Sequence, residues 1–361
     1  MLGRRIAVLA LAIGALLLLS ACSGPDRLNL DQLDLGELPQ NSLNPAGPES
    51  EKIDDLWWLV FWIAVGVFVA VGGAFVYAII RFRRRGKGQE RPVKQVHGNT
   101  RLEIVWTIIP AVILAVIAVP TVATIFDLRG EPDPSENALE IEVVGHQWWW
   151  EFRYPEYGFV TANEMHIPID RPVYLSMTSA DVIHSFWTPQ LNGKRDVVPG
   201  RITNLRLQAD EPGLFLGQCA EFCGLAHADM RHRVFAHTEA DFQAWAEAQA
   251  QPAVIPDEGP VAEGWQTFQL VCSACHAVDG TDATSDLAPN LTHFGSRTTF
   301  GAGTFENVEQ HLREWLRDPS SLKPMQPELN DLAAGRVLGM PAFGLTEAEI
   351  DSLITLLYAL D

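Results

Sequence analysis

Two long runs of residues without charge constrain the fold most, because such runs belong either in a membrane or deep inside a large core. They span residues 56–80 and 104–126 of a 361-residue chain. Each run is longer than the roughly 20 apolar residues that a helix needs to cross a bilayer. A buried helix of a soluble protein rarely stays uncharged over such a length. We therefore predict a transmembrane hairpin of two helices within residues 53–127.

The segment between the two runs predicts the orientation of this hairpin. Residues 81–101 carry eight basic residues and one acidic residue, Glu90. Basic loops next to a span stay in the cytoplasm. The chain is therefore predicted to be a multi-pass protein of the bacterial plasma membrane, with everything after residue 127 on the outer, periplasmic face.

The N-terminus reads as an export signal. Residues 1–22 carry Arg4 and Arg5 near the start, continue as an apolar stretch and end in Leu-Ser-Ala-Cys. Small residues directly before Cys22 are typical of a lipoprotein signal, so Cys22 is predicted to be lipidated rather than incidental. Residues 23–52 lack apolar periodicity and are predicted to be an outer tether.

Short apolar runs bounded by Gly, Pro and Asn follow the hairpin and predict an all-β domain over residues 128–250. Runs with this spacing favour an antiparallel sandwich or barrel. The clearest runs are 139–144, 173–178, 202–207 and 213–219. After a predicted helix near 241–250, three prolines mark residues 251–260 as a linker, and helical patterns fill residues 261–361.

A cluster of soft metal donors lies in the β domain. Cys219, Cys223, His227 and Met230 fall within twelve residues, and His184 precedes them in Val-Ile-His-Ser-Phe-Trp. Thiolate, imidazole and thioether groups suit copper rather than calcium or magnesium. Two thiolates can bridge two copper ions, and a pair of ions that shares one electron is suited to electron transfer.

The same cluster allows two other interpretations. A disulfide between Cys219 and Cys223 is chemically possible in an oxidising compartment, but it explains neither the histidines nor the methionine. A tetrahedral zinc site accepts Cys and His but gains nothing from Met230. We therefore favour copper.

A second motif, Cys272-Ser-Ala-Cys-His276, is the signature of covalent c-type haem. Cys272 and Cys275 would form the thioether bonds, and His276 would bind the iron. Met340 and Met325 are the two candidates for the sixth ligand. We choose Met340, because it lies in a Met-Pro loop just before a capping box and a final apolar-periodic helix.

Together these motifs resemble subunit 2 of the haem-copper cytochrome c oxidases, which carries the dinuclear copper centre called CuA. The resemblance covers nearly all of the chain after the signal and includes a fused C-terminal cytochrome c domain. It implies a cupredoxin-like Greek-key fold for residues 128–250 and an all-α class I cytochrome c fold for residues 261–361. The copper motif of that family is matched at His184, Cys219, Glu221, Cys223, His227 and Met230.

The resemblance also implies roles for three further groups. The backbone carbonyl of Glu221 would bind copper, and its carboxylate would face a magnesium ion shared with subunit 1. Trp148, in Gly-His-Gln-Trp-Trp-Trp, would be where electrons reach the copper site, although a purely structural aromatic cluster is the alternative. Since strand neighbours face opposite sides, at least one of the three tryptophans is expected to be exposed or at an interface. Glu103 would mark the entrance of a proton path, or else be an ordinary interfacial carboxylate.

Charge limits the partners. Residues 127–256 carry 9 basic and 19 acidic residues, and residues 257–361 carry 5 and 16. Such acidic domains exclude nucleic acid as a partner and should repel each other, so tether and apolar surface are expected to hold them together. By the resemblance the partners are subunit 1, other oxidase subunits, membrane lipid, and quinol–cytochrome c reductase or another cytochrome c as electron donor.

The expected function is that of the electron-accepting subunit of a proton-pumping cytochrome c oxidase, whose oxygen-reducing site lies on subunit 1. Two alternatives stay open at this level. One is the CuA subunit of a nitric oxide reductase. The other is a membrane-anchored copper carrier, against which the haem motif argues.

Overall fold

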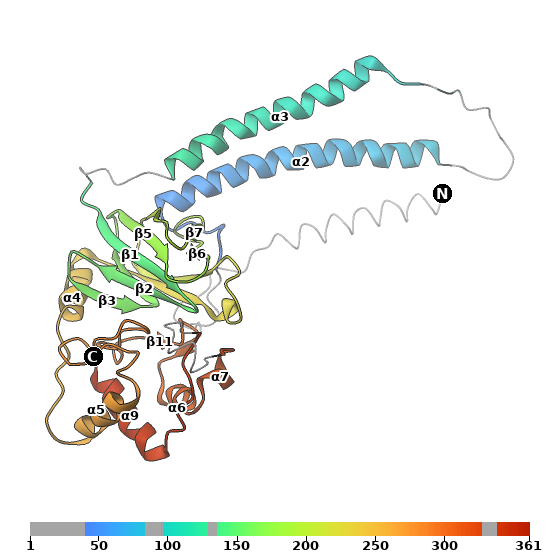
Figure 1. Ribbon diagram of the computed structural model, residues 1–361. Helices are drawn as coiled ribbons and strands as arrows, with labels where there is room; N and C mark the ends of the chain where they lie inside the picture. Colours follow the sequence, from blue (N-terminus) through green and yellow to red (C-terminus); the bar gives the residue numbers. More distant parts are fainter. Residues whose placement is uncertain (1–39, 84–94, 96, 129–135, 327–337) are drawn as a thin grey trace, which may run out of the picture. The chain divides into compact units, whose positions relative to one another are not determined.

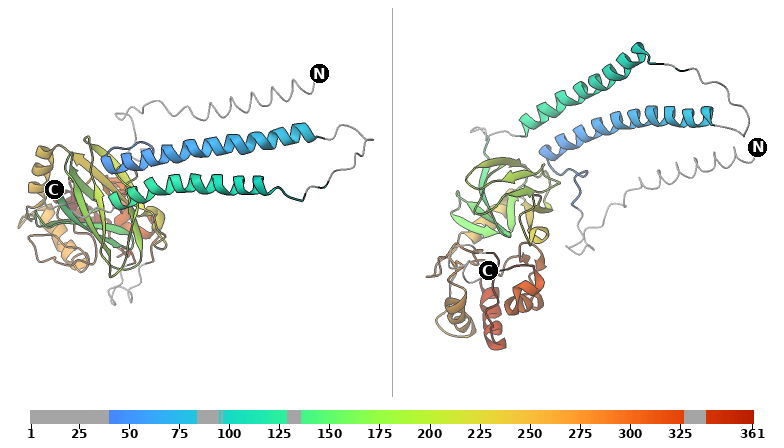
Figure 2. Two further views of the ribbon diagram at one scale, coloured as in Figure 1. Left: turned by 90° about the horizontal axis from the view of Figure 1, so that it is seen from above. Right: turned by 45° about the vertical axis from the view of Figure 1, so that its right-hand side comes forward.

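The computed structural model describes residues 40–83, 95, 97–128, 136–326 and 338–361, and Figure 1 shows the elements along the chain. Two helices, α2 (Pro48–Phe82) and α3 (Thr100–Asp127), contain the two predicted spans. The described part of the chain buries neither of their apolar windows, which leaves those side chains free for lipid. Figure 2 draws each helix as one unbroken rod. Cys22 and most of the basic loop lie outside the described residues.

The helix ends follow from local sequence. Pro48 stands in the first turn of α2, where its missing N–H costs no hydrogen bond, and Glu49 and Glu51 favour the positive end of the helix. Helix α2 thus begins before the apolar run, inside the stretch predicted as tether. Asn99 caps α3 by accepting from the N–H groups of Arg101 and Leu102.

Buried and exposed charges link the helices to the β domain. The Lys52 ammonium lies 2.7 Å from a carboxylate oxygen of Asp127, which joins the start of α2 to the end of α3. The buried Glu49 carboxylate lies 3.0 Å from the Arg206 guanidinium of the β domain.

The β domain consists of two five-stranded sheets. One has the strand order β3-β2-β1-β5-β8 and the other β4-β10-β9-β6-β7. The strands are β1 (Leu139–His146), β2 (Trp149–Tyr154), β3 (Phe159–Ala162), β4 (Glu164–Pro168), β5 (Val173–Ser179), β6 (His184–Trp187), β7 (Arg195–Val197), β8 (Thr203–Leu207), β9 (Gly213–Cys219) and β10 (Arg231–His237).

Most strand pairs are antiparallel, as expected, but two pairs are parallel. Strand β1 pairs in parallel with β5, and β4 pairs in parallel with β10. The chain visits the other sheet between β3 and β5, so it returns to β1 running in the same direction. The four predicted strands themselves are present, and the two-sheet domain agrees with the cupredoxin-like fold that the resemblance implied.

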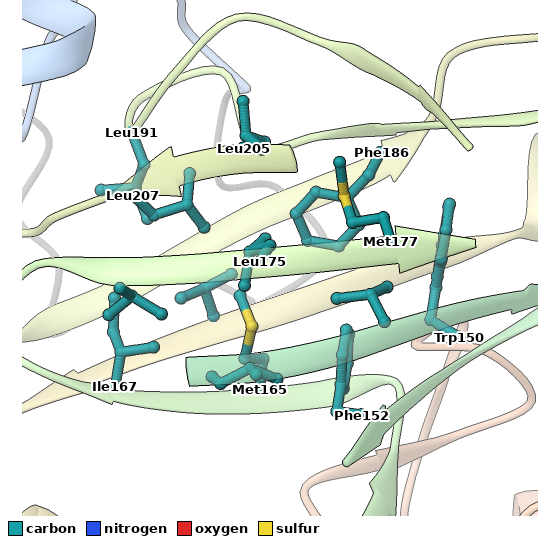
Figure 3. Packing of buried hydrophobic residues seen from close by; sticks show 14 of the residues in the cluster. Trp150, Phe152, Met165, Ile167, Leu175, Met177, Phe186, Leu191, Leu205 and Leu207 are labelled. Atoms are coloured by element: carbon teal, nitrogen blue, oxygen red, sulfur yellow. The ribbon is translucent and has the colours of Figure 1, made fainter. Parts of the chain in front are cut away.

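The core of the β domain lies between the two sheets. In β1, Leu139, Ile141 and Val143 are buried, whereas Glu140 and Glu142 are exposed, as the two-residue period of a strand requires. Figure 3 shows large side chains from both sheets meeting between the strands. Each such side chain contributes about 1.5–3 kcal/mol when fully buried.

Helix α4 (Glu239–Gln249) ends the β domain, and the C-terminal domain follows. Its elements are α5 (Pro260–Val271), β11 (Thr299–Phe300), β12 (Phe305–Glu306), α6 (Glu309–Arg317), α7 (Pro319–Leu322) and α9 (Glu347–Ala359). Gly264 lets α5 approach α9 closely, because a Cβ there would lie 2.2 Å from the Ser352 carbonyl oxygen. The predicted capping box of Thr346 and Glu349 is present at the start of α9.

Candidate copper and haem sites

The copper-type residues converge at one end of the β domain. They lie at the end of β9, in the loop of residues 220–230 that leads to β10, and on the neighbouring strand β6. The loop is fixed at its ends because Cys219 N–H donates to the Met230 carbonyl at 2.8 Å and Ala220 N–H donates to the Ser185 carbonyl at 2.9 Å. A loop anchored on a rigid sheet is a usual place for a site.

Five predicted side chains meet there. The Sγ atoms of Cys219 and Cys223 are 3.7 Å apart, and His184 Nδ1 lies 4.0 Å from Cys219 Sγ. His227 Nδ1 lies 3.5 Å and Met230 Sδ 3.8 Å from Cys223 Sγ. His184 and both cysteines are buried with their ligand atoms within 4.8 Å of one another. Both cysteines are free thiols, and their donor set with a thioether fits copper better than zinc.

The backbone carbonyl and the side chain of Glu221 lie in different surroundings. Its carbonyl oxygen lies 3.3 Å from Cys219 Sγ, at the cluster. Its side chain is exposed, so the carboxylate is accessible to a partner.

The two thiols are electrostatically unequal. The hydrogen bond between the two thiols, with further help from His184, lowers the pKa of Cys219 to about 3. The resulting thiolate, together with burial, raises the pKa of Cys223. This inequality favours the thiolate form at Cys219, which is the form in which cysteine binds metals.

Asp181 orients His184 and was not recognised in the sequence. Burial opposes the charged imidazole, but hydrogen bonds to Asp181 and Cys219 raise the pKa of His184. Asp181 Oδ1 lies 2.8 Å from His184 Nε2, which leaves Nδ1 facing the cysteines. A carboxylate behind a histidine ligand typically fixes the ring and strengthens the ligand.

Trp148 joins the copper cluster to the C-terminal domain. Its Nε1–H donates to the Cys223 carbonyl at 3.0 Å, and Gln147 Nε2 donates to the same oxygen at 2.7 Å. Trp148, Trp149 and Trp150 are all buried within the chain. The expectation of an interface residue holds for Trp149, which packs with Ala302 of the C-terminal domain.

A largely apolar cavity lies beside the second motif. Trp148 forms part of its wall, together with Cys272, Cys275, His276, Phe294, Leu312, Trp315, Leu353 and Leu357. His276 Nδ1 donates to the Pro289 carbonyl at 2.7 Å, which leaves Nε2 available as a ligand. Burial lowers the pKa of this histidine, so the imidazole is neutral.

The cavity chemistry fits covalent haem. Burial raises the pKa of Cys272 to about 12 and also raises that of Cys275, so neither is a thiolate poised for dithiol exchange. Arg297 lines the same cavity, and its buried Nε has no hydrogen-bond partner among the described residues. A cationic group of this kind suits the carboxylates of a haem.

The two methionine candidates pack with the cores of different domains. Met340 packs against the core of the C-terminal domain, and Trp315 Nε1–H donates to its Sδ at 3.2 Å. Met325 is buried with the core of the β domain. Both line the cavity, but the packing favours Met340 as the haem-domain ligand.

This assignment predicts the spectra of two matched variants. Met340→Ala should lose the low-spin, methionine-ligated haem spectrum, because the sixth ligand is gone. Met325→Ala removes a thioether of equal size from the same cavity and should keep that spectrum. Optical and magnetic circular dichroism spectra of the oxidised and reduced proteins test the pair, and the opposite pattern would transfer the ligand to Met325.

Glu103 caps a helix in this structure. Its Oε1 accepts from the backbone N–H of Asn99 at 3.2 Å at the start of α3. This bond satisfies one backbone group at the helix end and supplies a structural use for the carboxylate. The proton-path role therefore stays a prediction.

Family models match three parts of the chain. The transmembrane domain of cytochrome c oxidase subunit II matches residues 39–124, its periplasmic domain matches residues 159–236, and cytochrome c matches residues 261–361. These matches agree with the two apolar helices, the two-sheet domain and the helical C-terminal domain. A membrane anchor with a periplasmic domain follows, and so do copper and haem c as the implied cofactors.

Curated relatives match almost the full length. Cytochrome c oxidase subunit 2 of Alkalihalophilus pseudofirmus is 38% identical over 331 residues, which cover 90% of this chain and 92% of the relative. The same subunit of Bacillus sp. (strain PS3) is 38% identical over 338 residues, covering 89% and 91%.

Among solved structures, the periplasmic domain of subunit II of cytochrome oxidase (CoxB) of Bradyrhizobium japonicum is 32% identical, covering 32% of this chain and 95% of that one, with a TM-score of 0.31. From the near-complete match to the curated relatives, the chain belongs to the cytochrome c oxidase subunit 2 family, as a subunit of an oxidoreductase complex with a cytochrome c domain and a role in electron transfer.

Proposed function

We propose that this chain accepts electrons for a proton-pumping terminal cytochrome c oxidase and passes them from haem c to a dinuclear copper centre, and on to haem in subunit 1, where oxygen is reduced to water. The observation that carries this order is the position of Trp148. Trp148 lines the haem-type cavity, and its ring N–H donates a hydrogen bond to the Cys223 carbonyl at the copper cluster. One residue thus adjoins both sites.

Two sets of residues would hold the two cofactors. Cys272 and Cys275 would attach the haem, and His276 and Met340 would bind its iron. The copper pair would be held by His184, Cys219, Glu221, Cys223, His227 and Met230. When bound, both cofactors supply one-electron chemistry, which protein side chains alone do not provide. The chain's own contribution is to fix these ligands and to exclude water by burial.

Partners follow from the same proposal. Subunit 1 would receive the electron and share a magnesium ion with the exposed Glu221 carboxylate. The C-terminal domain would receive electrons from quinol–cytochrome c reductase or another cytochrome c. We place both redox domains on the outer face of the bacterial plasma membrane, with two spans, Cys22 as a lipid anchor and Glu103 at the cytoplasmic entrance of a proton path.

Removing the Trp148 ring tests the proposed order. In the assembled oxidase, Trp148→Ala should slow electron transfer from haem c to copper by about tenfold or more, because reacting groups lose rate steeply when their contact is disturbed. Copper and haem contents should be unchanged. Flash reduction of haem c, followed by the absorbance changes of both centres, measures the step.

A matched control is Trp245→Ala. That ring packs on Tyr154 and Phe159 in the β domain and lines neither site, so its loss should leave the step unchanged. Normal transfer in Trp148→Ala, with intact folding, would reject the role.

A further inference from the structure

One strip of the C-terminal domain, residues 298–302, forms hydrogen bonds with two buried polar side chains. The first is Glu164, at the start of β4, whose side chain is 3% exposed. Its carboxylate accepts from Thr298 N at 3.1 Å, Thr298 Oγ1 at 2.6 Å, Thr299 N at 2.7 Å and Thr299 Oγ1 at 2.6 Å. Every one of these donors belongs to the C-terminal domain.

Glu164 is held rigidly in place by its neighbour. Asn163 adopts a left-handed backbone with φ of 64°, and its Oδ1 accepts from Trp150 N–H at 2.9 Å. Its own N–H donates to the Trp150 carbonyl, and its carbonyl accepts from Arg233 N–H, both at 2.9 Å. Three backbone-level contacts therefore set the point from which the carboxylate projects.

The second side chain belongs to the C-terminal domain itself and reaches back to the β domain. Lys323, directly after α7, is 3% exposed, and its Nζ donates to the Trp148 carbonyl at 2.9 Å and to the Gly301 carbonyl at 3.2 Å. Burial lowers the pKa of this lysine to about 7. The two hydrogen bonds of the Lys323 amino group link the strip to the backbone of Trp148.

Further hydrogen bonds and apolar contacts join the β domain to the C-terminal domain. Arg231 N–H donates to the Ala302 carbonyl at 3.0 Å, and Thr304 Oγ1 donates to the Asp229 carbonyl at 3.2 Å. Ala302 also packs with Trp149 and Ala162 of the β domain. The sequence-based expectation that tether and apolar surface alone hold two acidic domains together is therefore wrong, because buried polar bonds cross between them.

We propose that Glu164 and Lys323 form a reciprocal clamp that holds the haem domain in one docked position against Trp148, and that both act as positioning residues for electron transfer from haem to copper. The inference rests on the proposed function. Thr299, Gly301, Lys323 and Trp148 all line the haem-type cavity, so the clamp and the cavity wall share residues.

The clamp predicts how the transfer rate depends on salt. In the native chain the domains are held by buried bonds, which salt screens weakly, so the haem-to-copper rate should not change with ionic strength. Without the clamp, repulsion between the two acidic domains would lower the docked population, and added salt would restore part of it. A merely structural role for these residues predicts no such gain of salt dependence.

The test uses the assembled oxidase with Glu164→Gln, Lys323→Met and the pair Thr298→Val with Thr299→Val, which removes the two hydroxyl donors to Glu164. Glu140→Gln and Lys194→Met, both at exposed positions, make the same charge changes elsewhere. Lys323→Arg keeps the charge and serves as a rescue. Flash reduction of haem c gives the haem-to-copper rate at low and high salt, and copper and haem spectra report the integrity of each site.

We expect each clamp variant to slow the haem-to-copper step by about tenfold to a hundredfold at low salt, because small displacements of the reacting groups strongly lower the rate. The spectra and the donor-to-haem rate should stay native, the loss should shrink at high salt, and Lys323→Arg should recover part of the rate. Native rates in all clamp variants at every salt concentration would overturn the clamp. Absence of haem-to-copper transfer in the unmutated oxidase would instead overturn the proposed function.

Discussion

Cys223→Ser is expected to abolish the shared-electron copper signal and to lower oxidase turnover by more than about 100-fold, since loss of an outer partner alone typically costs about 10–100-fold in metal binding or activity. Cys223 Sγ is the common point of the cluster, within 3.8 Å of Cys219, His227 and Met230. Serine offers a hard oxygen that binds copper poorly in such a set. Copper content, electron paramagnetic resonance and oxygen uptake of the purified oxidase measure the loss.

Ala228→Ser is the matched control for that variant. It adds a hydroxyl at an exposed position of the same loop without touching a ligand side chain. The control should keep native copper and turnover. If Cys223→Ser kept two coppers and native turnover, the cluster would not be the copper site of this chain.

Replacing both Cys272 and Cys275 by alanine should remove covalent haem. Because the haem then loses both of its thioether attachments, oxidation of a cytochrome c donor should fall by more than about 100-fold. The copper cluster should survive, because its residues come from β6, the end of β9 and the loop after β9. Electrons supplied directly to copper by a small artificial reductant should therefore still reach oxygen. Haem staining after denaturation and oxygen uptake with each reductant measure the two effects.

Ser273→Ala, within the same motif, should retain haem and turnover, because the Ser273 hydroxyl bonds only to the Gln269 carbonyl among described residues. Full donor oxidation by the double cysteine variant would show that electrons bypass this domain.

The sequence predicted those parts of the site whose residues lie close together along the chain. The cluster from Cys219 to Met230 sits in one loop, and the haem motif is a single turn after α5, so spacing alone placed their donors together. The spans were readable because no charge interrupts them. The domain type followed from the resemblance, while strand positions followed from short apolar runs.

Contacts between distant residues were not readable in this way. Glu164 meets Thr299 and Lys323 meets Trp148 only after two domains have folded and docked, and nothing near either charge predicts its partner. Overall charge argued for repulsion, but net charge does not reveal individual buried hydrogen bonds. The parallel pairing of β1 with β5 was hidden for a similar reason, since strand spacing carries no information on which sheet the chain visits next.

Electron paramagnetic resonance of the oxidised, purified oxidase, with copper and haem counted per copy of this chain, is the decisive test of the copper centre. We expect hyperfine structure from one electron shared equally by two coppers, together with one covalent haem on this chain. A mononuclear copper signal from this subunit, or a well-folded subunit without copper, would contradict the dinuclear assignment and return His184, Cys219 and Cys223 to copper handling or to a structural role.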